Sequence, residues 1–174
     1  MKKAGFMDIF LFIIIAFIVV VVLVLFKFAS STINTEMLAQ AANMQAQFSN
    51  TTNVTAIIEN TIGKVDEAFN HFKWITIFFI FGFALSILIS AFLVRTHPAY
   101  FIAYAMMVVI AIIISVYLSN SYETLSQTPV LASTFFSFTG ANYIMLYLPL
   151  WVTVIGLLAG ILMYISLDWG GIYR

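Results

Sequence analysis

Two histidines, His71 and His97, are the side chains in this sequence best suited to binding a metal or haem. An imidazole nitrogen ligates zinc or haem iron, but such a site needs further ligands close by. Twenty-six residues of helix would hold these two about 39 Å apart. The chain has no cysteine, and neither histidine has a close carboxylate pair to complete a site. We therefore interpret His71, with Asp66 and Glu67, as a hydrated helix face, and we expect no metal or cofactor.

Other catalytic patterns are missing from the sequence as well. Ionisable side chains within a membrane span mark ion pathways or proton relays, because charge is costly in hydrocarbon. Asp8 and Asp168 lie at the ends of apolar stretches, and none lies at a centre. The sequence contains no glycine-rich phosphate loop and no nucleophile elbow. The prediction is a protein that is not an enzyme and has no small-molecule substrate.

The composition indicates a membrane protein. Of the 174 residues, 63% are hydrophobic and only 8% are charged, and the mean hydropathy is +1.08. A water-soluble fold of this size cannot bury so much apolar surface. Seven basic residues balance seven acidic ones, which argues against nucleic acid as a partner. We expect an all-α integral membrane protein in contact with membrane lipids.

Four apolar stretches divide the chain, and a helix of about 20 such residues crosses about 30 Å of hydrocarbon. The spans are predicted at residues 9–26, 74–94, 100–118 and 142–167, with a kink at Pro149. The short connection between the second and third spans predicts a tight hairpin of these two helices. The predicted units are 1–28 (tail and first span), 29–73 (extracytoplasmic helical hairpin), 74–118 (second and third spans), 119–141 (outer loop) and 142–174 (fourth span and tail).

The orientation follows from the basic residues near the spans, which are more frequent on the cytoplasmic side. One side would carry Lys2, Lys3, Arg95 and Arg174, and the other Lys27, Lys64 and Lys73. Most acidic residues accompany the second group. We therefore expect both termini on the cytoplasmic side of a cytoplasmic membrane, or in the interior of a virion.

The polar segment 29–73 divides at residues 49–53, which favour a turn. Apolar residues recur at helical spacing on each side of this turn. They are Met37, Ala41, Met44 and Phe48, then Ile58, Val65 and Phe69. Two such stripes predict a projecting antiparallel hairpin that contacts partners; the alternative is two helices lying flat on the bilayer. Asn50 and Asn53 match the N-glycosylation pattern, although chance matches are common in such a turn.

Small residues at four-residue spacing favour close helix packing in lipid. They occur as Gly82, Ser86 and Ser90, as Ala111 and Ser115, and as Gly156 and Gly160. The last pair fits either an oligomer contact or packing inside one chain. The first span offers only Ala16, so we expect it to face lipid or a partner subunit.

Residues 129–138 form an apolar segment too short to cross the membrane. One interpretation is a re-entrant half-helix, as used in channels. The other is a helix lying at the outer interface, with Phe135, Phe136 and Phe138 buried and Ser133, Thr134 and Ser137 exposed.

Taken together, these features predict a non-enzymatic structural or accessory subunit of a larger membrane assembly, either a membrane complex or a lipid-containing virion. Its partners would be other subunits or further copies of itself. The alternative is an oligomeric pore, a channel or a holin-like permeabilising protein, built from the hydroxyl-bearing faces of the second and third spans and the segment 129–140.

Overall fold

The computed structural model describes residues 7–47, 53–93 and 98–165, and nearly all of these residues are helical. Four of the helical stretches are long and apolar enough to cross a membrane, which confirms the prediction of an all-helical chain with four such helices. The elements are α1 (Asp8–Gln47), α2 (Val54–Ile58), a π-helical turn η1 (Glu59–Gly63), α3 (Lys64–Leu93), α4 (Pro98–Ser126), α5 (Ala132–Ser137), α6 (Thr139–Leu146) and α7 (Leu148–Ile165).

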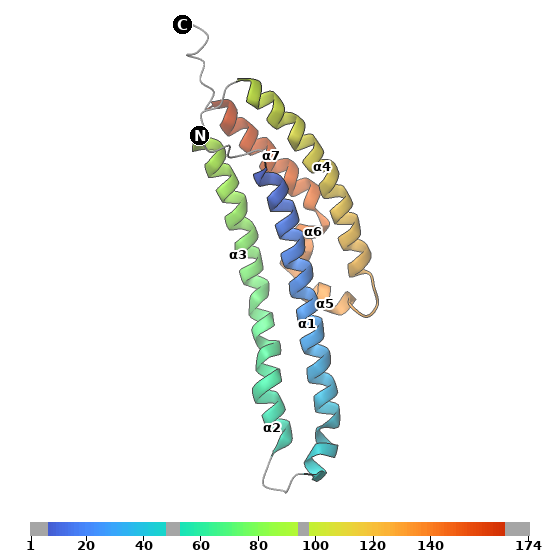
Figure 1. Ribbon diagram of the computed structural model, residues 1–174. Coiled ribbons are helices and arrows are strands. Elements are labelled where there is room, and N and C mark those ends of the chain that lie inside the picture. Colours follow the sequence, from blue (N-terminus) through green and yellow to red (C-terminus); the bar gives the residue numbers. More distant parts are fainter. Residues whose placement is uncertain (1–6, 48–52, 94–97, 166–174) are drawn as a thin grey trace.

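The longest helices form a pair that extends beyond the rest of the molecule. α1 has 40 residues and is therefore about 60 Å long. α2, η1 and α3 follow one another without a gap and run back along α1. Beyond the ends of α4 and α7, the two helical limbs of this pair continue as a projecting arm (Figure 1). The arm is defined here as residues 29–47, its first limb, and residues 53–72, its second limb. The arm continues the axes of the membrane-spanning parts and does not fold back onto them.

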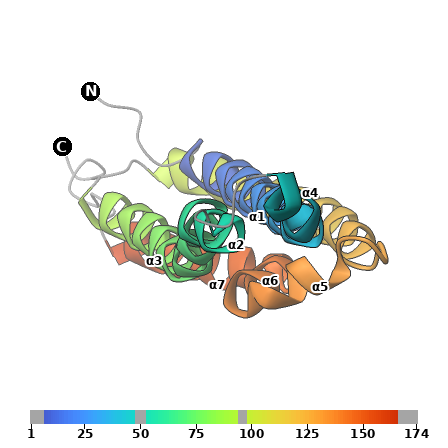
Figure 2. The same cartoon turned by 90° about the horizontal axis from the view of Figure 1, so that it is seen from below.

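The contacts of the four long helices close a ring, and Figure 2 shows these helices from the arm end of the molecule. α1 packs against α3 and α4, and α7 packs against the same two helices from the other side. α3 and α4 are consecutive in the sequence but lie diagonally opposite each other. The predicted tight hairpin of the second and third spans is therefore wrong. A short connection fixes only the ends of two helices, and here α1 and α7 pack between them.

α1 provides much of the core of this ring. Its buried positions recur every three or four residues: Ile9, Ile13, Ala16, Val20 and Val24. The expectation that the first span faces lipid or a partner subunit overlooked this buried side of the helix. It rested on the lack of small residues, but branched side chains at this spacing can also interdigitate with neighbouring helices.

The fourth span is interrupted before its proline. α6 ends at Leu146 and α7 begins at Leu148, so the helical path begins at Thr139, three residues earlier than predicted. Pro149 has no N–H to donate to the carbonyl one turn back. The hydroxyl of Ser119 on α4 donates to the carbonyl oxygen of Leu146, at 2.7 Å. A side chain of a neighbouring helix thus satisfies a backbone group at the break.

The loop predicted at residues 119–141 is shorter than expected, because α4 continues to Ser126. It is followed by α5, a single short helix beside the end of α4 (Figure 1). Phe135 and Phe138 are buried in the protein, Phe136 is 64% exposed on its surface, and Thr134 is buried although an exposed position was expected. Phe135 packs edge-on against the buried ring of Tyr122, which leaves Phe136 on the opposite side of the helix.

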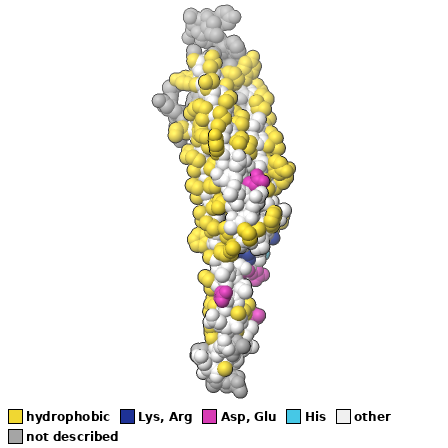
Figure 3. All heavy atoms as spheres, turned by 90° about the vertical axis from the view of Figure 1, so that its right-hand side faces the viewer, with side chains coloured by type: hydrophobic (Ala, Val, Ile, Leu, Met, Phe, Trp, Pro, Cys, Tyr) yellow, Lys and Arg dark blue, Asp and Glu magenta, His cyan; other side chains and the backbone are white. Residues whose placement is uncertain are grey.

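The side chains on the surface separate the molecule into two zones (Figure 3). Hydrophobic side chains cover most of the wide helical bundle. On the face shown, charged side chains gather where the bundle meets the arm and along the arm itself, apart from an acidic side chain on the bundle. This is the pattern expected when a lipid-embedded region gives way to one in water.

Candidate functional site

The tip of the arm has a small core of its own. The residues of this core come from both helical limbs of the arm and pack against one another, and they are separate from the core of the bundle. They are Ala41, Val54 and Ile58, all buried, with Met37, Leu38 and Met44 packed around them. Four predicted partner-contact residues therefore contact each other inside the arm, namely Met37, Ala41, Met44 and Ile58.

Hydrogen bonds close the tip on the described side of the turn. The side-chain oxygen of Asn53 accepts from the backbone N–H of Ala56 at 3.0 Å and caps α2. Gln45 Oε1 accepts from the backbone N–H of Val54 at 2.8 Å. Phe48 and Asn50 lie outside the described residues. Asn53, one of the two predicted glycosylation positions, thus has an exposed side chain that also serves as a helix cap.

An ion pair joins α1 and α3 at the base of the arm. Lys27 Nζ lies 2.7 Å from Asp66 Oδ2 and also donates to the backbone oxygen of Asp66 at 3.2 Å. Lys27 is only 8% exposed. The interpretation of Asp66 as part of a hydrated face with His71 was therefore wrong. No local pattern in the sequence indicates this pairing, because Lys27 and Asp66 are 39 residues apart.

A shallow apolar groove runs along one side of the arm next to this ion pair. Its volume is about 500 Å³, and Phe26, Ile33, Ile62, Val65 and Phe69 line it. The rings of Phe26 and Phe69 stack with their centroids 6.4 Å apart. Val65 is 51% exposed and Ile33 is 52% exposed. Val65 and Phe69, two of the predicted partner-contact residues, thus form an open surface that we call the arm groove.

The small residues of α4 and α7 lie at the contact between these two helices. A Cβ atom on Gly156 would lie 2.8 Å from Val108 Cγ1, and one on Gly160 would lie 3.4 Å from Tyr104 Cε1. The hydroxyl of Tyr104 donates to the carbonyl oxygen of Gly156 at 2.9 Å. Ala111 and Ser115 are also fully buried. Close approach of α4 and α7 therefore depends on the missing side chain of Gly156, whereas a Cβ at Gly160 would make an ordinary van der Waals contact.

The small residues of α3 are placed differently. Gly82 and Ser86 are exposed, Ser90 is half-buried, and no atom lies within 4 Å of a Cβ added at Gly82. On α4 the hydroxyl of Ser115 bonds to the carbonyl oxygen of Ile112 within its own helix. Because α3 and α4 are diagonal neighbours, the structure does not bring their serines together.

The described residues include no group of three or more His, Asp or Glu side chains arranged to hold a metal ion. His71 lies exposed on α3, and His97 is outside the described ranges.

No family model matches the chain, and no curated protein or solved structure is significantly similar to it. The features that bear on its function are thus the membrane-spanning bundle, the projecting arm and the open groove on that arm.

Proposed function

We propose that this chain is a non-enzymatic, multi-pass structural or accessory subunit of a larger membrane assembly, either a membrane-bound protein complex or the membrane of a lipid-containing virion. The bundle anchors the arm, and the arm contacts another protein. In this proposal the arm is extracytoplasmic and both termini are cytoplasmic, or interior to the virion.

The arm groove is the observation that carries this proposal. Large apolar side chains such as Ile33 and Val65 are half exposed on an arm that also carries five charged residues, namely Glu36, Glu59, Lys64, Asp66 and Glu67. Exposed apolar patches rimmed by polar residues mark protein interaction sites. Inside a bilayer such exposure is ordinary, but on an arm in water it favours coverage by a partner.

The construction of the arm supports the same role. The Lys27–Asp66 ion pair and the tip core around Ala41 hold the two helical limbs of the arm together at both ends of the groove. A partner would therefore meet a preorganised surface, which reduces the entropic cost of binding.

A photocrosslinking amino acid placed at Ile33 tests this proposal in the native membrane. The matched control is Thr35, which is also exposed but lies about 200° around the helix from Ile33. We expect a crosslinked product with an unrelated protein from position 33 and much less from position 35. Equal crosslinking from both positions would contradict a docking role for the groove. Crosslinks only to further copies of this chain would favour the oligomeric pore.

A further inference from the structure

A polar pocket opens between α3 and the segment that joins α5 to α6. Its volume is about 230 Å³. The lining residues are Lys73, Trp74, Ile77, Ser137, Thr139 and Gly140. Trp74 is 60% exposed, and a lysine beside an exposed tryptophan is typical of the boundary between lipid and water. The pocket therefore lies where the arm side of the bundle meets the membrane surface.

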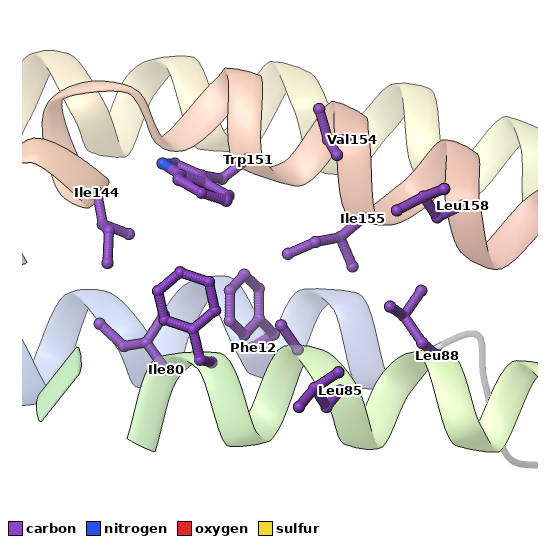
Figure 4. A pocket seen from close by; sticks show the side chains of 11 residues that line it. Phe12, Ile80, Leu85, Leu88, Ile144, Trp151, Val154, Ile155 and Leu158 are labelled. Atoms are coloured by element: carbon purple, nitrogen blue, oxygen red, sulfur yellow. The ribbon is translucent and has the colours of Figure 1, made fainter. Parts of the chain in front are cut away.

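A second, apolar groove lies one turn further along α3, beyond Ile77. Its volume is about 210 Å³, and hydrophobic side chains alone line it. Ile80 and Leu88 on α3 face Trp151 and Leu158 on α7 across the open space, and Phe12 of α1 lies behind it (Figure 4). We call the pocket and this groove together the α3–α7 seam.

The seam is longer than the hydrocarbon depth of one leaflet of a bilayer. Lys73 and Leu88 are fifteen residues apart on one helix, which corresponds to about 22 Å. Half of the hydrocarbon core is about 15 Å thick. The seam thus runs from the level of the lipid headgroups through the depth of one leaflet.

The polar end of the seam offers one free cation and two hydroxyl oxygens. Within residues 7–47, 53–93 and 98–165, no carboxylate lies within ion-pair distance of Lys73 Nζ. The hydroxyls of Ser137 and Thr139 donate to the carbonyl oxygens of Thr134 and Phe136, so their lone pairs remain available as acceptors. A phosphate fits the ammonium group, and hydroxyl groups of a ligand fit the two oxygens.

We propose that the α3–α7 seam binds one phosphatidylglycerol-type phospholipid, with its phosphate beside Lys73, its headgroup hydroxyls near Ser137 and Thr139, and one acyl chain in the apolar groove. The positive charge of Lys73 at one end of the seam favours a phospholipid over a protein helix as the occupant. A helix of a second copy would bring apolar side chains against Lys73, whereas a phospholipid matches both ends of the seam. This inference does not depend on the chain being a subunit of an assembly.

Native mass spectrometry of the full chain tests the proposal. The chain is released from nanodiscs that contain equal amounts of phosphatidylglycerol and phosphatidylcholine. We expect one retained phosphatidylglycerol per chain. Lys73→Gln should reduce its retention about tenfold, as expected for a lost charge-assisted hydrogen bond. Lys64→Gln removes the same charge from an exposed position on α3 outside the seam and should leave retention unchanged.

A second pair of variants tests the apolar part of the seam. Ala84 lines the groove, so Ala84→Phe should fill it and displace the acyl chain. Ser86→Phe adds a similar bulk to the exposed face of the same helix and should have no effect. Circular dichroism checks that both variants remain helical.

Three results would overturn the proposal: equal retention in Lys73→Gln and Lys64→Gln, retention that survives Ala84→Phe, or equal retention of both lipids. Inorganic phosphate added as a competitor separates a lipid from a free anion. A simple anion site would lose its ligand to phosphate, whereas a lipid that is also held through its acyl chain would remain.

Discussion

Replacement of Gly156 by leucine is the sharpest test of how the bundle is held together. In the native chain, a Cβ at this position would lie 2.8 Å from Val108 Cγ1 and 3.4 Å from Val108 Cγ2. The first of these distances is shorter than van der Waals contact, so α7 would have to move away from α4. That movement would also strain the hydrogen bond from the Tyr104 hydroxyl to the Gly156 carbonyl, which is 2.9 Å long.

The expected size of the effect follows from three contributions. Overpacking of a tight contact costs about 1–3 kcal/mol. Loss of the neutral hydrogen bond costs about 1 kcal/mol. Replacement of glycine by leucine within a helix stabilises the helix by about 1 kcal/mol, because leucine has the higher helix propensity. Gly156→Leu should therefore lower the free energy of unfolding by about 1–3 kcal/mol.

Gly82→Leu is the matched control, because no atom lies within 4 Å of a Cβ at that position. Only the helix-propensity gain applies there, so its stability should be unchanged or higher by up to about 1 kcal/mol. Thermal unfolding in detergent, followed by circular dichroism and tryptophan fluorescence, measures both variants. Equal unfolding temperatures for the two variants would refute the assignment of Gly156 to the contact between α4 and α7.

Three further predictions follow from the described contacts. Lys27→Ala should lower the free energy of unfolding by about 1–3 kcal/mol because it leaves Asp66 unpaired; a double-mutant cycle with Asp66→Ala that shows no coupling would contradict the ion pair. Ser119→Ala should cost about 1 kcal/mol because the carbonyl of Leu146 loses its donor, whereas Ser121→Ala, on the exposed face of α4, should change stability by less than about 0.5 kcal/mol. Because the chain has no cysteine, single cysteines at Thr61 and Gly171 can be labelled cleanly, and labelling from the same side of the membrane would contradict the four-span topology.

The four membrane-spanning helices could be predicted because run length alone identifies them. An uninterrupted apolar stretch of about 20 residues has few other uses in a protein. The apolar stripes on the two helical limbs of the arm could also be predicted from the sequence, because polar residues interrupt them. Polar residues between Met37, Ala41 and Met44 make a three- and four-residue spacing stand out.

Because the first span is apolar throughout, its sequence does not show which side of α1 is buried. Every residue from 9 to 26 is apolar, so the buried positions Ile13 and Val20 cannot be told from the exposed positions Ile14 and Ile18 by residue type. In a soluble helix, polar residues on the outer face would have marked the difference. Lipid removes this contrast, and the order of helices in the ring could not be derived from the chain.

Contacts between distant segments were also beyond the sequence. Lys27 and Asp66 are 39 residues apart, and their pairing depends on the register of α1 against α3. The hydrogen bond from Ser119 to Leu146 likewise depends on how α4 meets the break in the fourth span. Pro149 predicted that break, but no local pattern indicates which side chain satisfies the carbonyl at it.

The role of the chain as a subunit is tested most directly by gentle detergent extraction from its native membrane, followed by size analysis and mass spectrometry of every protein that migrates with it. We predict that the chain migrates with unrelated subunits or capsid proteins, and that Val65→Asp in the arm groove releases them while Thr61→Asp, on the exposed surface of η1, does not. Migration as a homogeneous oligomer of this chain alone, unchanged by Val65→Asp, would contradict the account and favour a pore.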